Sequence, residues 1–206
     1  MSYFITLEGG DGSGKSTLGQ ALVDQLKALT IPVLWTREPG GSEGAELIRS
    51  LLVTGNHDRW DGLTEYLLLS AARRDHITKT IQPALRSGQW VVCDRFFDSS
   101  LAYQGGGHGL DQDLLLSIFN GISEGLIPFK TFLLDIDPTL GLARTQKRHH
   151  HEVRYEALPM AFHERVRAAF LDLATNNTRY CVLDACQPPS VLLTKVMDEL
   201  ACVLPS

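Results

Sequence analysis

Positive charge is scarce in this sequence, and so are long hydrophobic runs. Its 19 lysines and arginines are outnumbered by 24 aspartates and glutamates, which gives a formal net charge of -5. Proteins that bind nucleic acids or membrane surfaces usually carry a basic excess, so we expect no nucleic acid and no membrane as partner. No apolar run is long enough to span a bilayer, and the first residues lack the pattern of a signal peptide.

Cysteine is also rare, and its positions follow no known pattern. The four cysteines have no metal-site spacing and lie in apolar or mixed stretches, at Cys93, Cys181, Cys186 and Cys202. Buried, reduced thiols of this kind are typical of a cytoplasmic protein. No linker-like stretch divides the 206 residues, so we expect a single domain, 1–206, located in the cytoplasm.

Short apolar runs alternate with longer segments of helical periodicity. The expected strands are Tyr3–Glu8, Pro32–Thr36, Trp90–Cys93, Thr131–Leu134 and Tyr180–Leu183. The expected helices are Gly14–Leu29, Glu43–Val53, Thr64–Leu85, Asp111–Ser123, Thr139–Lys147, Pro159–Ala174 and Ser190–Val203. This alternation predicts an α/β fold of three layers, with a five-stranded parallel core sheet surrounded by helices. Ligands of such sheets bind at the carboxyl ends of the strands, where we therefore expect the functional residues.

A glycine-rich segment, GGDGSGKS at residues 9–16, follows the first expected strand and precedes a helix. This pattern in this context is typical of a phosphate-binding loop, or P-loop, so the fold class becomes a P-loop NTPase sandwich. Its glycines let backbone N–H groups surround phosphate oxygens. We expect Lys15 to reach the β- and γ-phosphates of a purine nucleoside triphosphate, and the Ser16 hydroxyl to ligate Mg²⁺. The expected nucleotide-binding residues here are Gly10, Asp11, Gly12, Ser13, Gly14, Lys15, Ser16 and Thr17.

A bound Mg²⁺ ion also needs an acidic partner, and three aspartates that follow strands are candidates. Asp94 ends a hydrophobic strand and is the preferred choice. Asp135 and Asp137 end another strand, but Asp137 and the proline after it are also typical of a helix N-cap. We therefore expect Ser16 and Asp94 at the metal, with the other two aspartates as the alternative.

Missing motifs narrow the choice among P-loop proteins. No NKxD segment occurs, and no DxxG occurs outside the P-loop, which argues against a GTPase switch. Arginines instead collect beyond strand ends and on helices that face them: Arg37, Arg49, Arg73, Arg74, Arg95, Arg144, Arg148 and Arg154. Planar guanidinium groups suit phosphate oxygens, and phosphoryl transfer between two phosphorylated molecules needs several of them. The pattern indicates a kinase of a phosphorylated acceptor; a nucleotide-controlled binding protein is the alternative from another class.

Several segments resemble the thymidylate kinase (dTMP kinase) family along nearly the whole chain. They are LEGGDGSGKST (7–17), TREPGG (36–41), IRSLL (48–52), SAAR (70–73), DR with SSLAYQG (94–95 and 99–105) and DACQP (184–188). The resemblance implies Mg²⁺-dependent transfer of the ATP γ-phosphoryl group to dTMP, giving dTDP and ADP in dTTP biosynthesis. It also implies a homodimer, for which the apolar side of Thr64–Leu85 is a candidate interface.

The same resemblance implies which residues bind the acceptor. They are Asp11, Arg37, Pro39, Arg49, Leu69, Arg73, Arg95, Ser99, Ser100, Tyr103 and Gln104. Asp11 would touch the 3′-hydroxyl, and Tyr103 would pack under the deoxyribose unless it is a core aromatic. Arg73 would bond a thymine carbonyl oxygen, with Ser100 near the ring N3–H. Leu69 stands where the family often has an aromatic ring, which implies weaker stacking on the base.

The family also implies a catalytic set. Its members here are Lys15, Asp11, Arg95 and Arg148. Arg95 is similar to the arginine that bridges the donor and acceptor phosphates, and an ion pair with Asp94 or Glu38 is the alternative. Arg49 would hold the acceptor's phosphate, unless it belongs to a solvated helix face. Arg37 and Glu38 would fix the loop that carries Pro39.

Residues 144–156 resemble the family's lid, a segment that closes over the donor. One variant of the family has a catalytic basic residue in the P-loop, where this chain has Gly12, so we expect the charge to come from the lid. The candidate sources, in order, are Arg148, Lys147 and Arg154. Arg144 is expected to stack on the adenine of ATP, and Arg154 to contact ATP as well.

Overall fold

The computed structural model describes residues 2–56, 58–146, 154–175 and 177–204. Two of the expected lid cations, Lys147 and Arg148, therefore lie outside the described residues. No helix in the described ranges is both long enough and apolar enough to cross a membrane.

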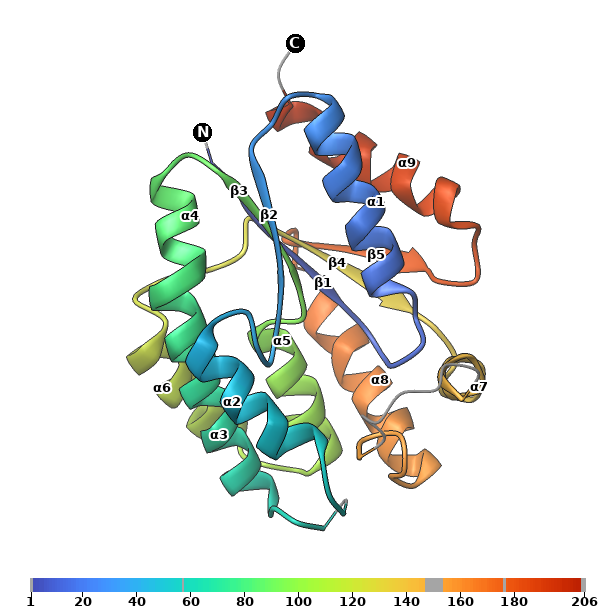
Figure 1. Ribbon diagram of the computed structural model, residues 1–206. Coiled ribbons are helices and arrows are strands. Elements are labelled where there is room, and N and C mark those ends of the chain that lie inside the picture. The colour runs from blue at the N-terminus through green and yellow to red at the C-terminus, as the bar shows by residue number, and fades with distance from the viewer. Residues whose placement is uncertain (1, 57, 147–153, 176, 205–206) are drawn as a thin grey trace.

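Five parallel strands form one sheet in the spatial order β2-β3-β1-β4-β5 (Figure 1). The strands are β1 (Phe4–Glu8), β2 (Val33–Arg37), β3 (Trp90–Asp94), β4 (Lys130–Asp135) and β5 (Tyr180–Asp184). The register pairs Asp94 with Leu7 on one side and with Arg37 on the other. The polar residues that end the strands therefore meet at one edge of the sheet, as the sequence predicts.

Helices cover both faces of this sheet and complete the three expected layers (Figure 1). They are α1 (Lys15–Ala28), α2 (Glu43–Val53), α3 (Gly62–His76), α4 (Gln82–Arg86), α5 (Phe97–Ser100), α6 (Gln112–Ile122), α7 (Pro138–Thr145), α8 (Met160–Ala174) and α9 (Pro189–Leu200). Helix α2 has the bounds expected from the sequence. Helix α7 begins as expected for an N-cap, because the Asp137 carboxylate accepts a hydrogen bond from Thr139 N at 2.9 Å.

Two π-helical turns depart from the predicted pattern. The single helix expected over Thr64–Leu85 is instead α3 and α4 joined by a π-helical turn, Ile77–Ile81. A second one, Leu101–Gly107, continues α5 and was not predicted, because three successive glycines disfavour a helix. Those glycines allow close packing: a Cβ on Gly106 would lie 2.5 Å from the Cβ of Ala169 in α8. Wide turns of this kind are frequent at functional sites.

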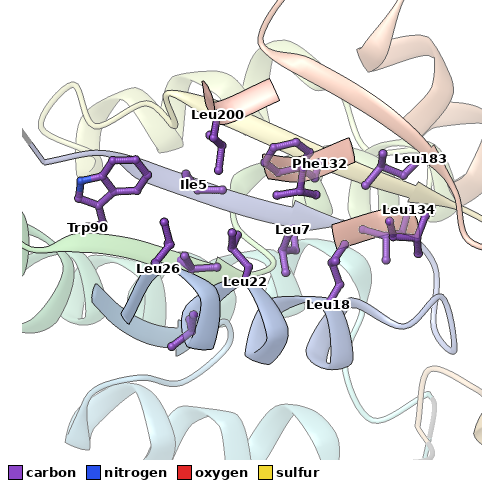
Figure 2. Close-up of a cluster of buried hydrophobic side chains, with 14 of the residues drawn as sticks. Ile5, Leu7, Leu18, Leu22, Leu26, Trp90, Phe132, Leu134, Leu183 and Leu200 are labelled. Carbon is purple, nitrogen blue, oxygen red and sulfur yellow. The ribbon is translucent and has the colours of Figure 1, made fainter. Parts of the chain in front are cut away.

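The largest core cluster fills the space between the sheet and helices α1 and α9 (Figure 2). Leu18, Leu22 and Leu26 repeat at helical spacing along α1, and all three are buried against β1 and its neighbours. Further clusters lie under α3, α6 and α8 on the opposite face. Because both faces are covered, the sheet is a rigid base from which its strand ends project.

The thiols differ from the expectation of four buried cysteines. Cys93 is buried in β3 and Cys181 is half-buried, whereas Cys186 and Cys202 are exposed; all four are free. Burial raises the pKa of the Cys93 and Cys181 thiols, so these two are the less reactive pair.

Candidate active site

The P-loop is folded around the ammonium group of Lys15. The side chain of this lysine, in the first turn of α1, donates hydrogen bonds to the carbonyl oxygens of Gly9 at 3.0 Å and Gly10 at 2.8 Å. It also approaches the Ser13 hydroxyl at 3.3 Å. The loop thus places a buried positive charge at the N-terminus of α1, where backbone N–H groups already favour an anion.

Gly12 has a conformation and a neighbour that exclude a side chain. Its φ is +73°, in the left-handed region, and a Cβ here would collide with the carbonyl oxygen of Gly141 in α7. Gly141 is constrained by the same contact, because its own Cβ would collide with the carbonyl oxygen of Asp11. With α7 in this position, a catalytic basic residue cannot occupy position 12.

The expected metal residues lie next to each other. Ser16 Oγ donates a hydrogen bond to Asp94 Oδ2 at 2.7 Å, which joins the start of α1 to the end of β3. The alternative aspartates are engaged elsewhere: Asp137 caps α7, and Asp135 accepts two hydrogen bonds from Arg167 at 2.7 and 2.9 Å. Of the three candidates, Asp94 is the one that meets the P-loop hydroxyl.

Arg95 links the P-loop to Tyr103, one of the residues expected to bind the acceptor. Its backbone is in the left-handed region, with φ +69°, and its N–H donates to Leu7 O at 2.9 Å. Its guanidinium donates to the Gly9 carbonyl at 2.9 Å, to the Asp11 carboxylate at 2.7 Å and to the Tyr103 hydroxyl at 3.0 Å. The ion pair of Arg95 is therefore with Asp11 rather than with Asp94 or Glu38. A strained non-glycine residue of this kind is typical of functional sites.

Burial and neighbouring charges lower the pKa values of Lys15 and Asp11, two residues of the P-loop. Burial, and then the positive charge of Arg95, lower the pKa of Lys15 to about 8. Burial alone would raise the pKa of Asp11, but the positive charges of Arg95 and Lys15 outweigh it and hold this pKa below its usual value. Asp11 is therefore an anionic hydrogen-bond acceptor at neutral pH, and Lys15 loses its proton unusually easily until an anion binds.

Glu8, which the sequence did not single out, supports Arg95 from inside the fold. One carboxylate oxygen of this completely buried residue accepts from Phe96 N at 2.7 Å, and the other accepts from Ser99 Oγ at 2.6 Å. Ser99 Oγ in turn accepts from Arg95 at 3.0 Å. Burial, and then the negative charge of Asp98, raise the pKa of Glu8 to about 8. Glu8 thereby fixes the residues on both sides of the strained Arg95 backbone.

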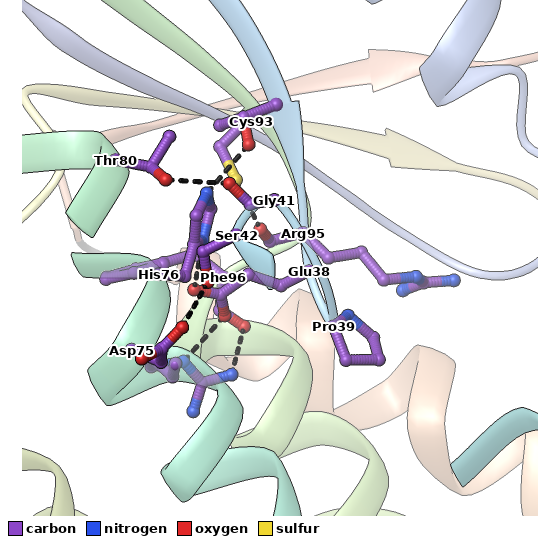
Figure 3. A network of polar contacts seen from close by, with 12 residues as sticks. Glu38, Pro39, Gly41, Ser42, Asp75, His76, Thr80, Cys93, Arg95 and Phe96 are labelled. Atoms are coloured by element: carbon purple, nitrogen blue, oxygen red, sulfur yellow. Dashed lines mark hydrogen bonds and ion pairs between the residues drawn. The ribbon is translucent and has the colours of Figure 1, made fainter. Parts of the chain in front are cut away.

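Arg73 belongs to a second, deeply buried polar network. Its side chain is 2% exposed and donates to Glu38 at 2.7 Å, to Phe96 O at 3.2 Å and to Ser100 Oγ at 3.1 and 3.2 Å. Glu38 follows β2 and is joined by a cis peptide bond to Pro39; Figure 3 shows Glu38 beside His76, the last residue of α3. Burial would raise the pKa of Glu38, but the positive charge of Arg73 and the hydrogen bond with His76 outweigh it and lower this pKa. Arg73 is thus held between α3, β2 and α5 before any ligand binds.

The loop after β2 and helix α2 contact the other acceptor-side arginines. Arg49 of α2 donates to the Pro39 carbonyl at 2.6 Å, so it belongs to this loop rather than to a solvated helix face. Arg37 is exposed and pairs with Glu46 at 3.3 Å. Arg74, in contrast, points to α6, where it donates to the Ile122 carbonyl and pairs with Glu124. Arg74 therefore has a structural role.

A cavity of about 290 Å³ brings these groups together. All of the residues expected to bind the acceptor line it, together with Lys15 and Asp94: Asp11, Arg37, Pro39, Arg49, Leu69, Arg73, Arg95, Ser99, Ser100, Tyr103 and Gln104. Tyr103 lines this cavity and is also a core aromatic, because it belongs to a buried cluster with α8. The cavity is large enough for a small polar ring with an attached sugar phosphate.

Arg154, for which the sequence predicts a contact with ATP, also lines this cavity. It is 3% exposed and its guanidinium donates to the Glu65 carboxylate of α3 and to the Leu52 and Asn56 carbonyl oxygens. Glu65 is itself buried and accepts from Gln104 at 2.7 Å. A buried carboxylate needs a paired cation, and the pairing with Glu65 places Arg154 on the acceptor side. No local sequence pattern indicates that Glu65 is buried.

Among the described residues, the donor side includes Arg144 and the segment that follows β5. Arg144, in the last turn of α7, is exposed and donates to the Ala185 carbonyl at 3.1 Å, next to the segment Asp184–Gln187. Arg144, the residue expected to stack on adenine, therefore lies beside the segment that follows β5.

A P-loop that shares one cavity with buried arginines defines a P-loop nucleotide kinase. The profile of the family described as "Thymidylate kinase" matches residues 7–196, and this chain belongs to that family. It is similar to the thymidylate kinase of Magnetococcus marinus, with 48% identity over 96% of this chain and 94% of the relative. That of Caulobacter vibrioides is 47% identical over 89% of this chain and 88% of the relative. The crystal structure of thymidylate kinase from Ehrlichia chaffeensis matches with a TM-score of 0.78 and 35% identity, covering 97% and 98% of the two chains.

Proposed function

We propose that this chain transfers the γ-phosphoryl group of ATP to dTMP, giving dTDP and ADP in nucleotide biosynthesis. The observation that carries the proposal is one cavity whose wall includes both Lys15 and Arg95 of the phosphate site and the buried Arg73. Membership of the thymidylate kinase family supports the same reaction. The attacking atom is a phosphate oxygen of the acceptor, so the reaction needs positioning and charge neutralisation rather than a general base.

The buried polar groups of the cavity fit a thymine ring. Gln104 donates through its amide nitrogen to Glu65, which fixes its orientation, and its buried Oε1 has no hydrogen-bond donor among the described residues. This oxygen fits the ring N3–H, while the terminal nitrogens of Arg73 beside Ser100 fit a carbonyl oxygen. A pocket built to pair donor with acceptor in this order rejects a ring whose polar groups are reversed, as in cytosine.

The phosphates and the sugar contact the residues around the P-loop. Lys15 and Arg95 neutralise the transferring phosphoryl group, and Arg49 holds the acceptor's phosphate. Asp11 bonds the 3′-hydroxyl, and the Tyr103 ring packs under the deoxyribose. A further cation comes from the lid, with Arg148 as the first candidate. Arg144 stacks on the adenine of ATP.

The site also fits a Mg²⁺ ion brought in with ATP. Ser16 and Asp94 offer a hydroxyl and a carboxylate oxygen side by side, which is the donor chemistry that Mg²⁺ prefers when phosphates supply its other ligands. When bound, the ion would neutralise charge on the β- and γ-phosphates. Ser16 and Asp94 are the residues that would hold it.

We further propose that the chain works as a homodimer. Leu47 and Leu51 of α2 and Leu63 and Leu67 of α3 are exposed on two helices that pack together. A face of this kind on neighbouring helices fits the same face of a second copy related by a twofold axis. A cytoplasmic location, a single domain, and the absence of nucleic-acid and membrane partners stay predictions from the sequence.

A coupled assay of ADP production tests the proposed reaction. ATP and Mg²⁺ are supplied with one acceptor at a time: dTMP, dUMP, the ribose form of TMP, dCMP, dGMP or AMP. We expect strong preference for dTMP, and comparable turnover of dUMP would mean that Leu69 leaves the base pocket open at the methyl group. Slow ATP hydrolysis that no acceptor stimulates would contradict the proposal and favour a nucleotide-controlled binding protein.

A further inference from the structure

His76, the last residue of α3, is fully buried and uses both of its ring nitrogens. Nδ1 lies 3.1 Å from Glu38 Oε1, and both residues are labelled in Figure 3. Nε2 lies 2.7 Å from Thr36 Oγ1. The pKa of Glu38 is lowered, so its carboxylate is ionised and only accepts hydrogen bonds. The proton between Glu38 and His76 therefore sits on Nδ1, and this nitrogen is the donor.

The acceptor loop, residues 38–41, is wrapped around this ring. Gly41 has φ +83°, and a Cβ there would collide with His76 Nε2 and Thr36 Oγ1. Its carbonyl accepts from Thr80 Oγ1 at 2.7 Å, one helical turn beyond His76 (Figure 3). The histidine is therefore in contact with both ends of the loop, Glu38 on one side and Gly41 on the other.

This contact reaches the acceptor pocket through Glu38. One oxygen of its carboxylate accepts from His76, and the other accepts from Arg73 at 2.7 Å. A carboxylate that was free to rotate would pull Arg73 Nε with it and turn the two terminal nitrogens away from Ser100. Because Glu38 is buried and held from both sides, the fork of Arg73 has one orientation.

We propose that His76 is a positioning residue for acceptor recognition, which sets the preference for the base by fixing Glu38 and, through it, Arg73. This inference rests on the proposed dTMP kinase activity and assigns a role to a residue that lines no part of the cavity. The ring does not touch the acceptor. Its effect is on the apparent affinity for dTMP and on base preference, not on the phosphoryl-transfer step.

Two substitutions separate the two ring contacts. In His76→Asn the side-chain amide nitrogen lies near the place of Nδ1 and keeps the hydrogen bond to Glu38. In His76→Gln it lies near the place of Nε2, keeps the contact with Thr36 and loses that with Glu38. We expect His76→Gln to raise the KM for dTMP roughly tenfold, the effect of one lost hydrogen bond to a charged group. The kcat/KM ratio of dTMP over dCMP falls with it, while the KM for ATP is unchanged.

Thr36→Val is the matched control for packing. It removes the contact on the other side of the ring and leaves Glu38 in place, so it lowers the melting temperature without raising the KM for dTMP. Equal increases in the KM for dTMP in His76→Gln, His76→Asn and Thr36→Val would overturn the proposal in favour of a packing role. A wild-type protein that does not phosphorylate dTMP would instead refute the proposed function, so the two failures are distinguishable.

A measurement on the wild-type protein covers the case in which His76→Gln does not fold. Nitrogen-15 spectra of labelled histidine rings, with His76 assigned by its loss in His76→Asn, should show a protonated Nδ1. We expect its resonance to move when dTMP is added and to stay in place when a non-hydrolysable ATP analogue is added. A resonance that ignores dTMP, or that moves equally with both ligands, would overturn the proposal.

Discussion

Among the described residues, the acceptor half of the site contains buried groups that bond to each other, whereas two residues of the donor half are exposed. Arg73 is 2% exposed and is bonded to Glu38, Phe96 O and Ser100 within the fold. Arg144 and Ser16, on the donor half, are exposed. The difference teaches how the two ligands are selected. Binding of the acceptor to a preformed pocket costs little ordering entropy, whereas the donor is recognised largely by the charge at the P-loop.

The substitution with the largest expected effect is Lys15→Ala, because Lys15 is the point at which the two halves meet. We expect turnover to fall by on the order of 10³, since a preorganised charge at the transferring group is lost. The fold persists, because the carbonyls of Gly9 and Gly10 become accessible to water. Steady-state kinetics with a circular dichroism spectrum tests this, with the exposed Lys27→Ala of the same helix as control. Retained turnover would remove Lys15 from the mechanism.

Arg73→Lys tests the preformed half directly. Lysine keeps the charge beside Glu38 but cannot form a planar fork, so the base loses a directed donor. We expect the KM for dTMP to rise roughly 100-fold and the KM for ATP to stay unchanged. If both KM values rose together, the two halves would not be independent and the comparison would fail. Arg74→Lys, on the neighbouring residue that points to α6, is the control.

Gly12→Ala disturbs the donor half alone. The added methyl group meets the Gly141 carbonyl and requires a left-handed backbone, so we expect a loss of about 2 kcal/mol in the free energy of unfolding. Gly10→Ala is the matched control for stability, because its Cβ would meet no atom within 4 Å. Chemical denaturation of both variants measures the difference. Equal stability of the two would mean that α7 moves away at little cost.

The mildest way to sharpen the comparison is to change the pH. The positive form of Lys15 dominates below its pKa of about 8 and is lost as the pH rises through that value. The kcat/KM for ATP should therefore fall about tenfold per pH unit above pH 8. The Lys15→Arg variant, whose guanidinium stays charged, should lack this decline. A flat wild-type profile up to pH 9.5 would show that the ammonium group keeps its proton.

Much of the fold could be predicted because its determinants are local. Each strand is a short apolar run, and the P-loop occupies eight consecutive positions, so neither depends on distant residues. Asp94 could be preferred over its rivals for the same reason, since Asp137 and Pro138 form a recognisable cap. The edge at which strand ends meet then follows from parallel topology alone.

The supporting network could not be predicted, because its partners are far apart in the chain. Glu8 meets Ser99 across 91 residues, His76 meets Glu38 across 38, and Glu65 meets Arg154 across 89. Hydrophobic periodicity does not indicate such a pair, and the sequence alone does not distinguish a buried acidic residue from an exposed one. The same limit applies to the buried place of Arg154, which depends on Glu65.

The contact between Gly12 and Gly141 also restricts how this chain can evolve. A lineage with α7 seated on the P-loop cannot acquire a basic P-loop residue at position 12 by one substitution, because the intermediate carries the collision without a compensating shift of the helix. The effect of a change at either glycine depends on the other, so the two positions are epistatic. Placing a basic residue at position 12 would require α7 and the loop to change together.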